Sequence, residues 1–279
     1  GVITALGVGA AFTLEDIQNG YLKYRHNGSE TPLTDHFDFT ISDGSGDNEP
    51  SARFNITILP VNDAPQLSAL NPLTYFEDDG ATLIDPAVNF NDVDLANGAS
   101  YNAGTTLTIA YTLGSGTIGD QLSLRNQGAG ANQVGFNAGS GEVSYAGTVI
   151  ATVNPADSAT NGANGAQLVI TFNASANVAA VKAVLENLTF QNTDLANASQ
   201  LTAQATRSLR YTFVDGGGAA SRQDDAGTTL QGVDTVVVDT SIIVKQRNDA
   251  PVMNPGDTVL APISEDETSN GRSLRVSTL

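Results

Sequence analysis

Alternating apolar and polar residues recur along the chain and predict β-strands over most of its length. In the first sixty residues, the run at 35–42 places Phe37, Phe39 and Ile41 on one face of a strand. The other expected strands lie at 21–25, 52–59, 105–113, 121–124, 133–136, 143–153, 167–172, 208–214 and 233–244. The pattern therefore predicts an all-β protein built from antiparallel β-sandwiches.

A single short helix is expected within this β-rich pattern, at 176–188. Its apolar positions recur at helical spacing and form one stripe: Val178, Val181, Leu185 and Leu188. Ser175 is the expected N-cap. Such a stripe usually packs into a core, so we expect a core helix and not a docking surface. The Gly-, Asn- and Ala-rich stretch at 114–165 is interpreted as hairpins and loops inserted in the same sandwich.

The tetrapeptide Asn-Asp-Ala-Pro follows a predicted strand twice, at 62–65 and at 248–251. Proline removes a backbone donor and holds the preceding residue extended, so each copy ends a strand and begins a stiff linker. The copies divide the chain into 1–61, the end of a sandwich domain; 62–247, a larger sandwich with long insertions; and 248–279, a linker and the start of a further repeat.

The charge balance indicates which partners the chain can take. Its 279 residues carry 30 acidic and 12 basic side chains, a net charge of −18. Because phosphate binding relies on Lys and Arg clusters, nucleic acid and anionic membranes are not expected partners, whereas divalent cations are. The chain has no cysteine, so neither disulfides nor thiolate metal sites can stiffen it. No apolar run reaches the length of a membrane span, and no signal sequence opens the chain, which favours an internal part of a longer secreted protein.

Acidic motifs follow each linker at similar spacing. Glu77 lies fifteen residues after Asn62, and Glu265 lies seventeen residues after Asn248. Asp92-Val93-Asp94 follows the first of these motifs, and such a pair of carboxylates is typical of a cation-binding loop. Several carboxylates at one hinge repel one another, and a hard ion with six to eight oxygen ligands reverses that repulsion. Calcium tolerates irregular ligand cages better than magnesium does.

The order of these motifs resembles the cadherin-like tandem modules of giant bacterial surface adhesins of the RTX type. Residues 12–17, 26–30 and 37–44 resemble a repeat of the chondroitin-sulfate-proteoglycan type, and 119–126 and 185–190 resemble a second module of the same proteins. The resemblance implies tandem immunoglobulin-like or cadherin-like sandwiches on the cell surface, linked to adhesion, biofilms or filaments. It also implies a calcium-rigidified extender segment whose partners are neighbouring repeats of the same polypeptide.

In such rods, calcium at a junction is held by the preceding domain, the linker and the top of the following domain. The resemblance implies these ligands at the first junction: Glu15, Asp16, Asn62, Asp63, Asp92, Asp94 and Asp215. It implies these at the second: Glu77, Asp78, Asp194, Asn248 and Asp249. The linker is one acidic ligand shorter than the Asp-x-Asn-Asp-Asn of animal cadherins, so one or two ions per junction are expected.

Other interpretations of the same residues remain open. Each Asn-Asp pair alone is compatible with an Asx turn, and each acidic run with a solvated loop. A carbohydrate- or surface-binding role for the Gly- and Asn-rich loops is the alternative function, although tryptophan is absent and Tyr101, Tyr111 and Tyr145 are scattered. His26 and His36 are isolated, and no nucleophile and base are paired, so an enzyme is not expected. The partial domains at both ends also suggest head-to-tail association of copies, in which the 248–279 tail supplies strands to the first domain of a neighbour.

Overall fold

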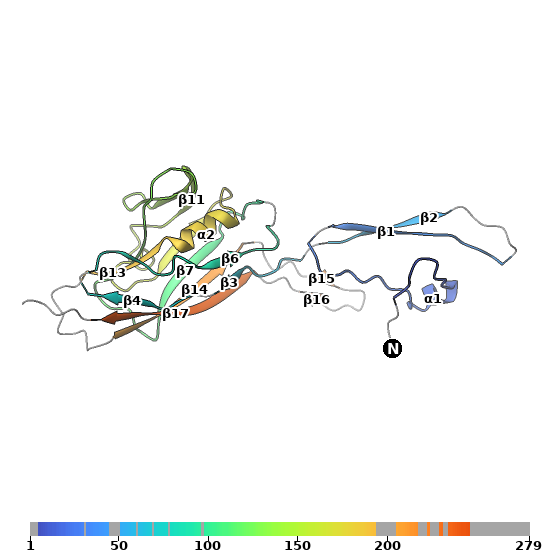
Figure 1. The fold of residues 1–279 in the computed structure, drawn as a ribbon, viewed down its shortest axis with the longest axis horizontal. Helices are drawn as coiled ribbons and strands as arrows, with labels where there is room; N and C mark the ends of the chain where they lie inside the picture. Colours follow the sequence, from blue (N-terminus) through green and yellow to red (C-terminus); the bar gives the residue numbers. More distant parts are fainter. Residues whose placement is uncertain are drawn as a thin grey trace, which may run out of the picture.

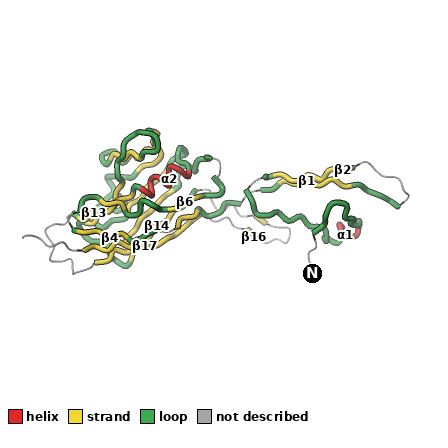
Figure 2. The backbone as a smooth tube through the Cα atoms, in the orientation of Figure 1, coloured by secondary structure: helices red, strands yellow, loops and turns green. Residues whose placement is uncertain are grey.

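The computed structural model describes residues 5–30, 32–44, 51–59, 61–68, 70–77, 79–95, 98–193, 205–216, 222–223, 229–230 and 234–245. Strands make up most of its regular structure, and both described helices are short, which confirms the predicted all-β class (Figure 2). The N-terminal unit, residues 5–59, contains α1 (Leu14–Gln18), β1 (Thr34–Phe39) and β2 (Ala52–Thr57). None of the described helices is long and apolar enough to cross a membrane.

The central domain, residues 61–245, holds the other elements (Figure 1). Its first strands are β3 (Gln66–Ser68), β4 (Leu73–Phe76), β5 (Thr82–Leu83), β6 (Asn89–Asn91), β7 (Thr106–Thr112), β8 (Asp120–Leu124), β9 (Val134–Asn137), β10 (Glu142–Tyr145), β11 (Thr148–Thr152) and β12 (Leu168–Phe172). The chain continues through α2 (Val178–Glu186), β13 (Leu188–Asn192), β14 (Ala205–Val214), β15 (Arg222–Gln223), β16 (Thr229–Leu230) and β17 (Thr235–Lys245).

The central domain is a layered β-structure with its core between two sheets. The larger sheet has eight strands in the order β4-β17-β14-β7-β12-β11-β10-β9, and the smaller has three in the order β5-β13-β8. The rings of Tyr75 and Phe190 meet edge to face at 5.0 Å between these two sheets. The ring of Phe90, in the separate two-stranded sheet of β3 and β6, meets that of Phe213 in the same way, also at 5.0 Å. Such pairs are worth about 0.5–1.5 kcal/mol beyond the apolar area that they bury.

Helix α2 packs into this core, as its apolar stripe predicts. Val181 and Leu185 are buried, and Val178 packs against the core from a half-buried position. The predicted cap is wrong, because Asn177 and not Ser175 occupies the N-cap. The Asn177 side chain accepts a hydrogen bond of 2.9 Å from the Ala180 amide, which leaves Ser175 outside the helix.

Two strand predictions also need correction. The single strand expected at 143–153 is a hairpin of β10 and β11, turned by Ala146 and Gly147, which both have positive φ angles. The strand expected at 21–25 does not form, because no described strand lies beside it to complete its backbone hydrogen bonds. The hairpins expected within 114–165 are present, with β9, β10 and β11 ending the larger sheet.

Candidate cation site at the first linker

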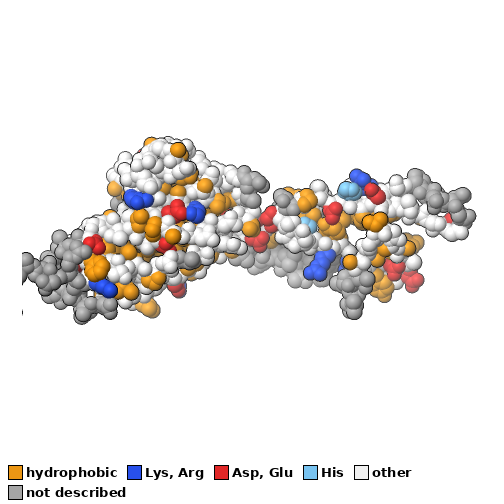
Figure 3. Space-filling model, in the orientation of Figure 1, with side chains coloured by type: hydrophobic (Ala, Val, Ile, Leu, Met, Phe, Trp, Pro, Cys, Tyr) orange, Lys and Arg blue, Asp and Glu red, His pale blue; other side chains and the backbone are white. Residues whose placement is uncertain are grey.

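The first Asn-Asp-Ala-Pro lies between β2 and β3, where the N-terminal unit meets the central domain (Figure 1). Pro65 is buried and anchors the central-domain end of the linker, whereas the Asp63 side chain is exposed. Acidic side chains gather at this boundary on the face seen in Figure 3. The linker therefore connects the two folded parts at a place where acidic side chains gather.

Two hydrogen bonds fix the linker onto the central domain. The Asn62 side-chain amide donates to Asp215 Oδ2 over 2.9 Å, and the Asp63 backbone amide donates to Asp94 Oδ2 over 2.7 Å. Asp215 follows β14, and Asp94 follows β6, so the ends of two separate strands hold the linker. The Asp94 amide donates in turn to Asp92 Oδ1 over 3.1 Å, which orders the Asp-Val-Asp loop.

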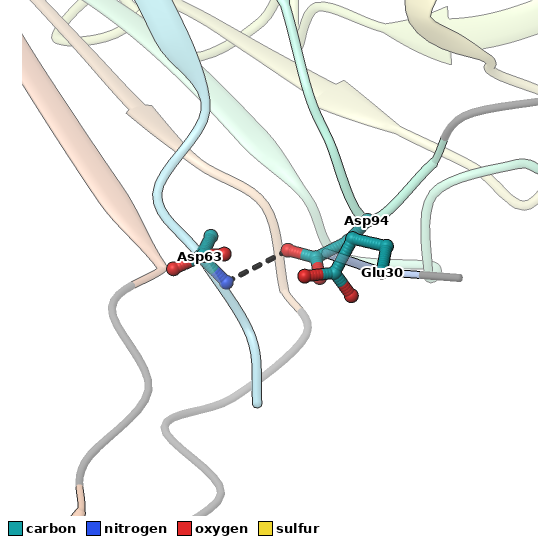
Figure 4. A group of neighbouring side chains, drawn as sticks. All are labelled: Glu30, Asp63 and Asp94. Atoms are coloured by element: carbon teal, nitrogen blue, oxygen red, sulfur yellow. Dashed lines mark hydrogen bonds between the residues drawn. The ribbon is translucent and has the colours of Figure 1, made fainter. Parts of the chain in front are cut away.

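Three carboxylates from different parts of the chain converge here. Glu30 of the N-terminal unit, Asp63 of the linker and Asp94 of the central domain each place an oxygen within 4.8 Å of the others (Figure 4). An open hollow of about 410 Å³ borders them, lined by Gly28, Ser29, Glu30, Asp63, Ala64, Gln66 and Val93. The group thus spans the boundary between the two folded parts.

The proton affinities of these carboxylates reflect their crowding. Burial raises the pKa of Glu30, and the charges of Asp94 and Asp63 raise it further. Burial likewise raises the pKa of Asp94, against the lowering effect of the hydrogen bond from the Asp63 amide. Two charges 4.8 Å apart repel by roughly 3 kcal/mol at an effective dielectric constant near 20. Negative charge at this site is therefore costly without a cation.

Two deeper residues extend the acidic site into the central domain. Asp92 is only 3% exposed, and burial raises its pKa. The hydroxyl of Tyr101, also 3% exposed, lies beside Asp92, and burial followed by this negative charge raises the pKa of the tyrosine. A tyrosine so deeply buried has no ring face free to stack on a sugar, which removes one residue from the carbohydrate-binding alternative.

The donor set fits calcium. All three converging side chains offer carboxylate oxygens, which hard cations prefer, and no described nitrogen or sulfur ligand joins them. Calcium binds oxygen at about 2.3–2.6 Å, so ligand atoms on opposite sides of one ion lie roughly 5 Å apart. The convergence within 4.8 Å is compatible with that spacing. Asn62, Asp92 and Asp215 adjoin the group through the hydrogen bonds and charges described above.

The implied ligands of the first junction are only partly brought together. Asn62, Asp63, Asp92, Asp94 and Asp215 lie at the boundary. Glu15 and Asp16 are in α1, away from the linker (Figure 1), and are not members of the converging group. Asp16 caps that helix instead, since its carboxylate accepts hydrogen bonds from the Thr13 amide and hydroxyl.

Glu30 was not expected as a ligand. Its only sequence signal is its place at the end of the 26–30 turn, which interrupts the β-pattern just before β1. Linear spacing could not find it, because Glu30 lies thirty-three residues before Asp63 and reaches the linker only after the chain has folded back through β1 and β2.

The second implied junction lies mostly outside the described residues, which include neither Asp78, Asp194, Asn248 nor Asp249. Glu77 is described and is 8% exposed. Its backbone amide donates to the Lys245 carbonyl over 2.9 Å, which places it beside the end of β17, where the chain runs toward the second Asn-Asp-Ala-Pro. The ligand role of Glu77 stays a prediction.

The fold and this site define a modular all-β protein whose parts meet at an acidic linker. A family model described as Cadherin-like matches residues 3–58. The chain is also 33% identical over 87 residues to the Extracellular matrix organizing protein FRAS1 of Mus musculus. That match covers 30% of this chain and 2% of the length of the mouse protein. The N-terminal part is therefore similar to the Cadherin-like family, and the chain spans a small fraction of the length of this relative.

Proposed function

We propose that this chain is an extender segment of an extracellular adhesion protein, in which calcium at the first linker fixes the N-terminal unit to the central domain. The observation that carries the proposal is the convergence of Glu30, Asp63 and Asp94 from both units and the linker. An ion bound by all three would neutralise their repulsion and couple the orientations of the two parts.

The location and setting form part of the same proposal. The cadherin-like match and the similarity to an extracellular matrix protein support an extracellular role. The chain has no cysteine, so disulfides cannot stiffen it, and we propose that calcium at the acidic linker does so. We assign the segment to a bacterial surface adhesin or filament of the RTX type, because the order of linker and acidic motifs resembles the modules of those proteins.

Calorimetric calcium titration tests the proposal. We expect the wild-type chain to bind calcium with a dissociation constant of about 10⁻⁴ to 10⁻³ M, the range of extracellular modules. Asp63→Ala and Asp94→Ala should each weaken binding at least tenfold. Glu142→Ala is the matched control, because it removes an exposed carboxylate from β10, away from the linker. A wild-type chain that releases no heat and gains no thermal stability with calcium would refute the proposal.

Small-angle X-ray scattering separates binding from rigidification. Calcium should narrow the distribution of distances between the two parts of the wild-type chain, and Glu30→Gln should abolish this narrowing. A glycan array adds the opposing test: clear sugar binding that survives Asp94→Ala would favour the carbohydrate-binding alternative.

A further inference from the structure

The hydroxyl of Tyr101 is a buried polar group that forms no hydrogen bond with any residue that the structure describes. The side chain is only 3% exposed, so water has little access to it. Tyr75, which is also deeply buried, donates its hydroxyl to the Asp79 carbonyl. Burying a hydroxyl without a partner destabilises a fold. A tyrosine in place of phenylalanine at position 101 therefore needs a reason beyond core packing.

Aromatic packing places Tyr101 beneath the acidic residues at the first linker. Its ring meets that of Phe213 edge to face at 5.4 Å, and the ring of Phe90 meets the same Phe213 ring at 5.0 Å. Asp215 lies two residues after Phe213, and Asp92 lies two residues after Phe90. Side chains two residues apart along an extended chain share a face, so both carboxylates follow the rings that Tyr101 packs against.

Backbone contacts fix the turn that begins at Tyr101. The Tyr101 amide donates to the Ala176 carbonyl over 2.8 Å. The Thr105 hydroxyl donates to the Asn102 carbonyl over 2.9 Å, and it also contacts the Asp215 carbonyl. The turn is thus held against the residue that follows β14, and the tyrosine ring cannot swing away from the acidic residues.

Asp92 is the acceptor that faces the Tyr101 hydroxyl. Burial raises the pKa of Tyr101 most, and the charge of Asp92 raises it further, ahead of the charges of Asp215 and Asp94. Asp92 Oδ1 accepts the Asp94 amide over 3.1 Å. Because a carboxylate has about four lone-pair sites, Asp92 can accept a second donor and still bind an ion. The hydroxyl and the carboxylate therefore lie together without the geometry of a hydrogen bond.

We propose that Tyr101 is a positioning residue of the cation site, whose hydroxyl donates to Asp92 when calcium is bound and holds that carboxylate in its ligand orientation. The inference rests on the calcium site of the proposed function. Hydrogen bonds from residues behind the ligands orient those ligands, and they commonly contribute to metal affinity. The hydroxyl gains its partner only with the ion, so the penalty of burying it is relieved on binding.

Tyr111 provides a matched comparison for a purely structural tyrosine. Its hydroxyl is likewise buried without a hydrogen bond to any described residue. Tyr111 pairs with Leu209 in the first half of β14, whereas Asp215 follows the end of that strand. The two tyrosines thus share an unpaired hydroxyl and differ in their distance from the linker, so only Tyr101 should influence calcium.

Calorimetric calcium titration of Tyr101→Phe and Tyr111→Phe tests the role of the hydroxyl. Tyr101→Phe should weaken calcium binding by about tenfold, the lower end of the range for residues that orient metal ligands. Tyr111→Phe should bind calcium like the wild-type chain. In chelator, Tyr101→Phe should melt at or above the wild-type temperature, because an unpaired buried hydroxyl has been removed and the ring remains. This result separates lost positioning from a damaged fold.

Fluorine NMR of chains that carry 3-fluorotyrosine reads the hydroxyl directly. The chain has seven tyrosines, and the two phenylalanine variants assign the signals of Tyr101 and Tyr111. Calcium should shift the Tyr101 signal and leave that of Tyr111 in place. In Asp92→Asn, the Tyr101 signal should stay near its position in chelator. A full shift in that variant would mean that Asp92 is not the acceptor, and would overturn the proposed contact.

The two proposals fail in different ways. A wild-type chain that does not bind calcium would refute the calcium site and, with it, the role of Tyr101. Calcium binding that is strong in the wild-type chain and equally strong in Tyr101→Phe would refute the positioning role alone. An equal loss of affinity in Tyr101→Phe and Tyr111→Phe would also overturn it, because the effect would then belong to the core and not to Asp92.

Discussion

Asp94 should have opposite effects on stability with and without calcium. Its raised pKa means that the folded state holds its proton more tightly than the unfolded state, so its ionised form destabilises the fold. This penalty is fully present above the folded-state pKa and disappears below the unfolded-state value of about 3.9. Proton binding and calcium binding are therefore two ways of relieving the same repulsion.

We expect Asp94→Asn to raise the melting temperature in chelator at pH 7–8, and the gain should shrink to zero as the pH falls toward 4. The asparagine oxygen can still accept the Asp63 amide, so the loop is preserved. With calcium in excess the same substitution should lower the melting temperature, because a ligand is lost. Thermal unfolding over this pH range with and without calcium is the measurement, and a change of the same sign in both conditions would contradict the ligand role.

A buried ion pair joins the two sheets of the central domain. Arg207 of β14 donates from Nε to Asp120 Oδ2 of β8 over 2.5 Å, and from Nη2 to the Thr117 hydroxyl over 2.9 Å. Asp120 also accepts the Asn192 side-chain amide over 2.7 Å. The Asp120 side chain is fully buried, so it depends on these donors in place of water.

Arg207→Met should lower the free energy of unfolding by about 3–5 kcal/mol, because it leaves a buried carboxylate without its counterion. Arg210→Met is the control: it breaks the exposed pair with Asp239 and should change stability little. Denaturant titration of both variants gives the comparison. Removal of both charges in Asp120→Asn with Arg207→Met should restore part of the loss, and equal effects of the two single variants would refute the distinction.

Residue identities alone predicted the local chemistry of the linker better than its long-range partners. The Asn-Asp pair and the Asp-Val-Asp loop can be recognised in the sequence as acidic motifs. The structure joins them through the hydrogen bond from the Asp63 amide to Asp94. Glu30 and Tyr101 carry no such local signal. Their positions depend on how β1, β2 and the central domain fold together, which the spacing along the chain does not encode.

At the scale of elements, the hydrophobic periodicity predicted whether a segment forms a helix or a strand better than it predicted where that segment begins and ends. The helix was expected from its apolar stripe, but Ser175 and Asn177 are both good cap residues, and only the path of the chain selects Asn177. The 21–25 segment alternates like a strand and yet pairs with nothing that is described, because a strand requires a neighbour as well as a pattern.

The two candidate caps of α2 make this point testable. Asn177→Ala removes the acceptor for the Ala180 amide and should destabilise the central domain by about 1 kcal/mol. Ser175→Ala, at an exposed position before the helix, should have much less effect. Chemical unfolding followed by circular dichroism measures both variants, and a larger loss for Ser175→Ala would reinstate the cap expected from the sequence.

For the whole molecule, the buried core belongs to the central domain. Every buried hydrophobic side chain among the described residues lies between Pro65 and Val244. The N-terminal unit contributes exposed aromatic and aliphatic residues and few tertiary constraints. The described strands of the N-terminal unit are therefore expected to open more readily than those of the central domain.

A chain that starts at Val61 should keep the main cooperative unfolding transition within a few degrees of the full chain in chelator. Hydrogen exchange of the monomeric full chain should show fast exchange across β1 and β2 and slow exchange across β14 and β7, since only the latter strands lie within a buried sheet. Loss of the cooperative transition on truncation would show that the first unit contributes to the core of the second.

The hairpins β1–β2 and β14–β17 each carry one ion pair across their strands, with the two charges exchanged: Asp38 with Arg53, and Arg210 with Asp239. If β1 paired with β17 so that these positions met, Asp38 would face Asp239, and if β14 paired with β2 in the same way, Arg210 would face Arg53. Like charges directly opposite each other destabilise an antiparallel pair, so each strand selects its own partner over the similar one. The reversed polarity of the two ion pairs thus disfavours an exchange of strands between the two hairpins.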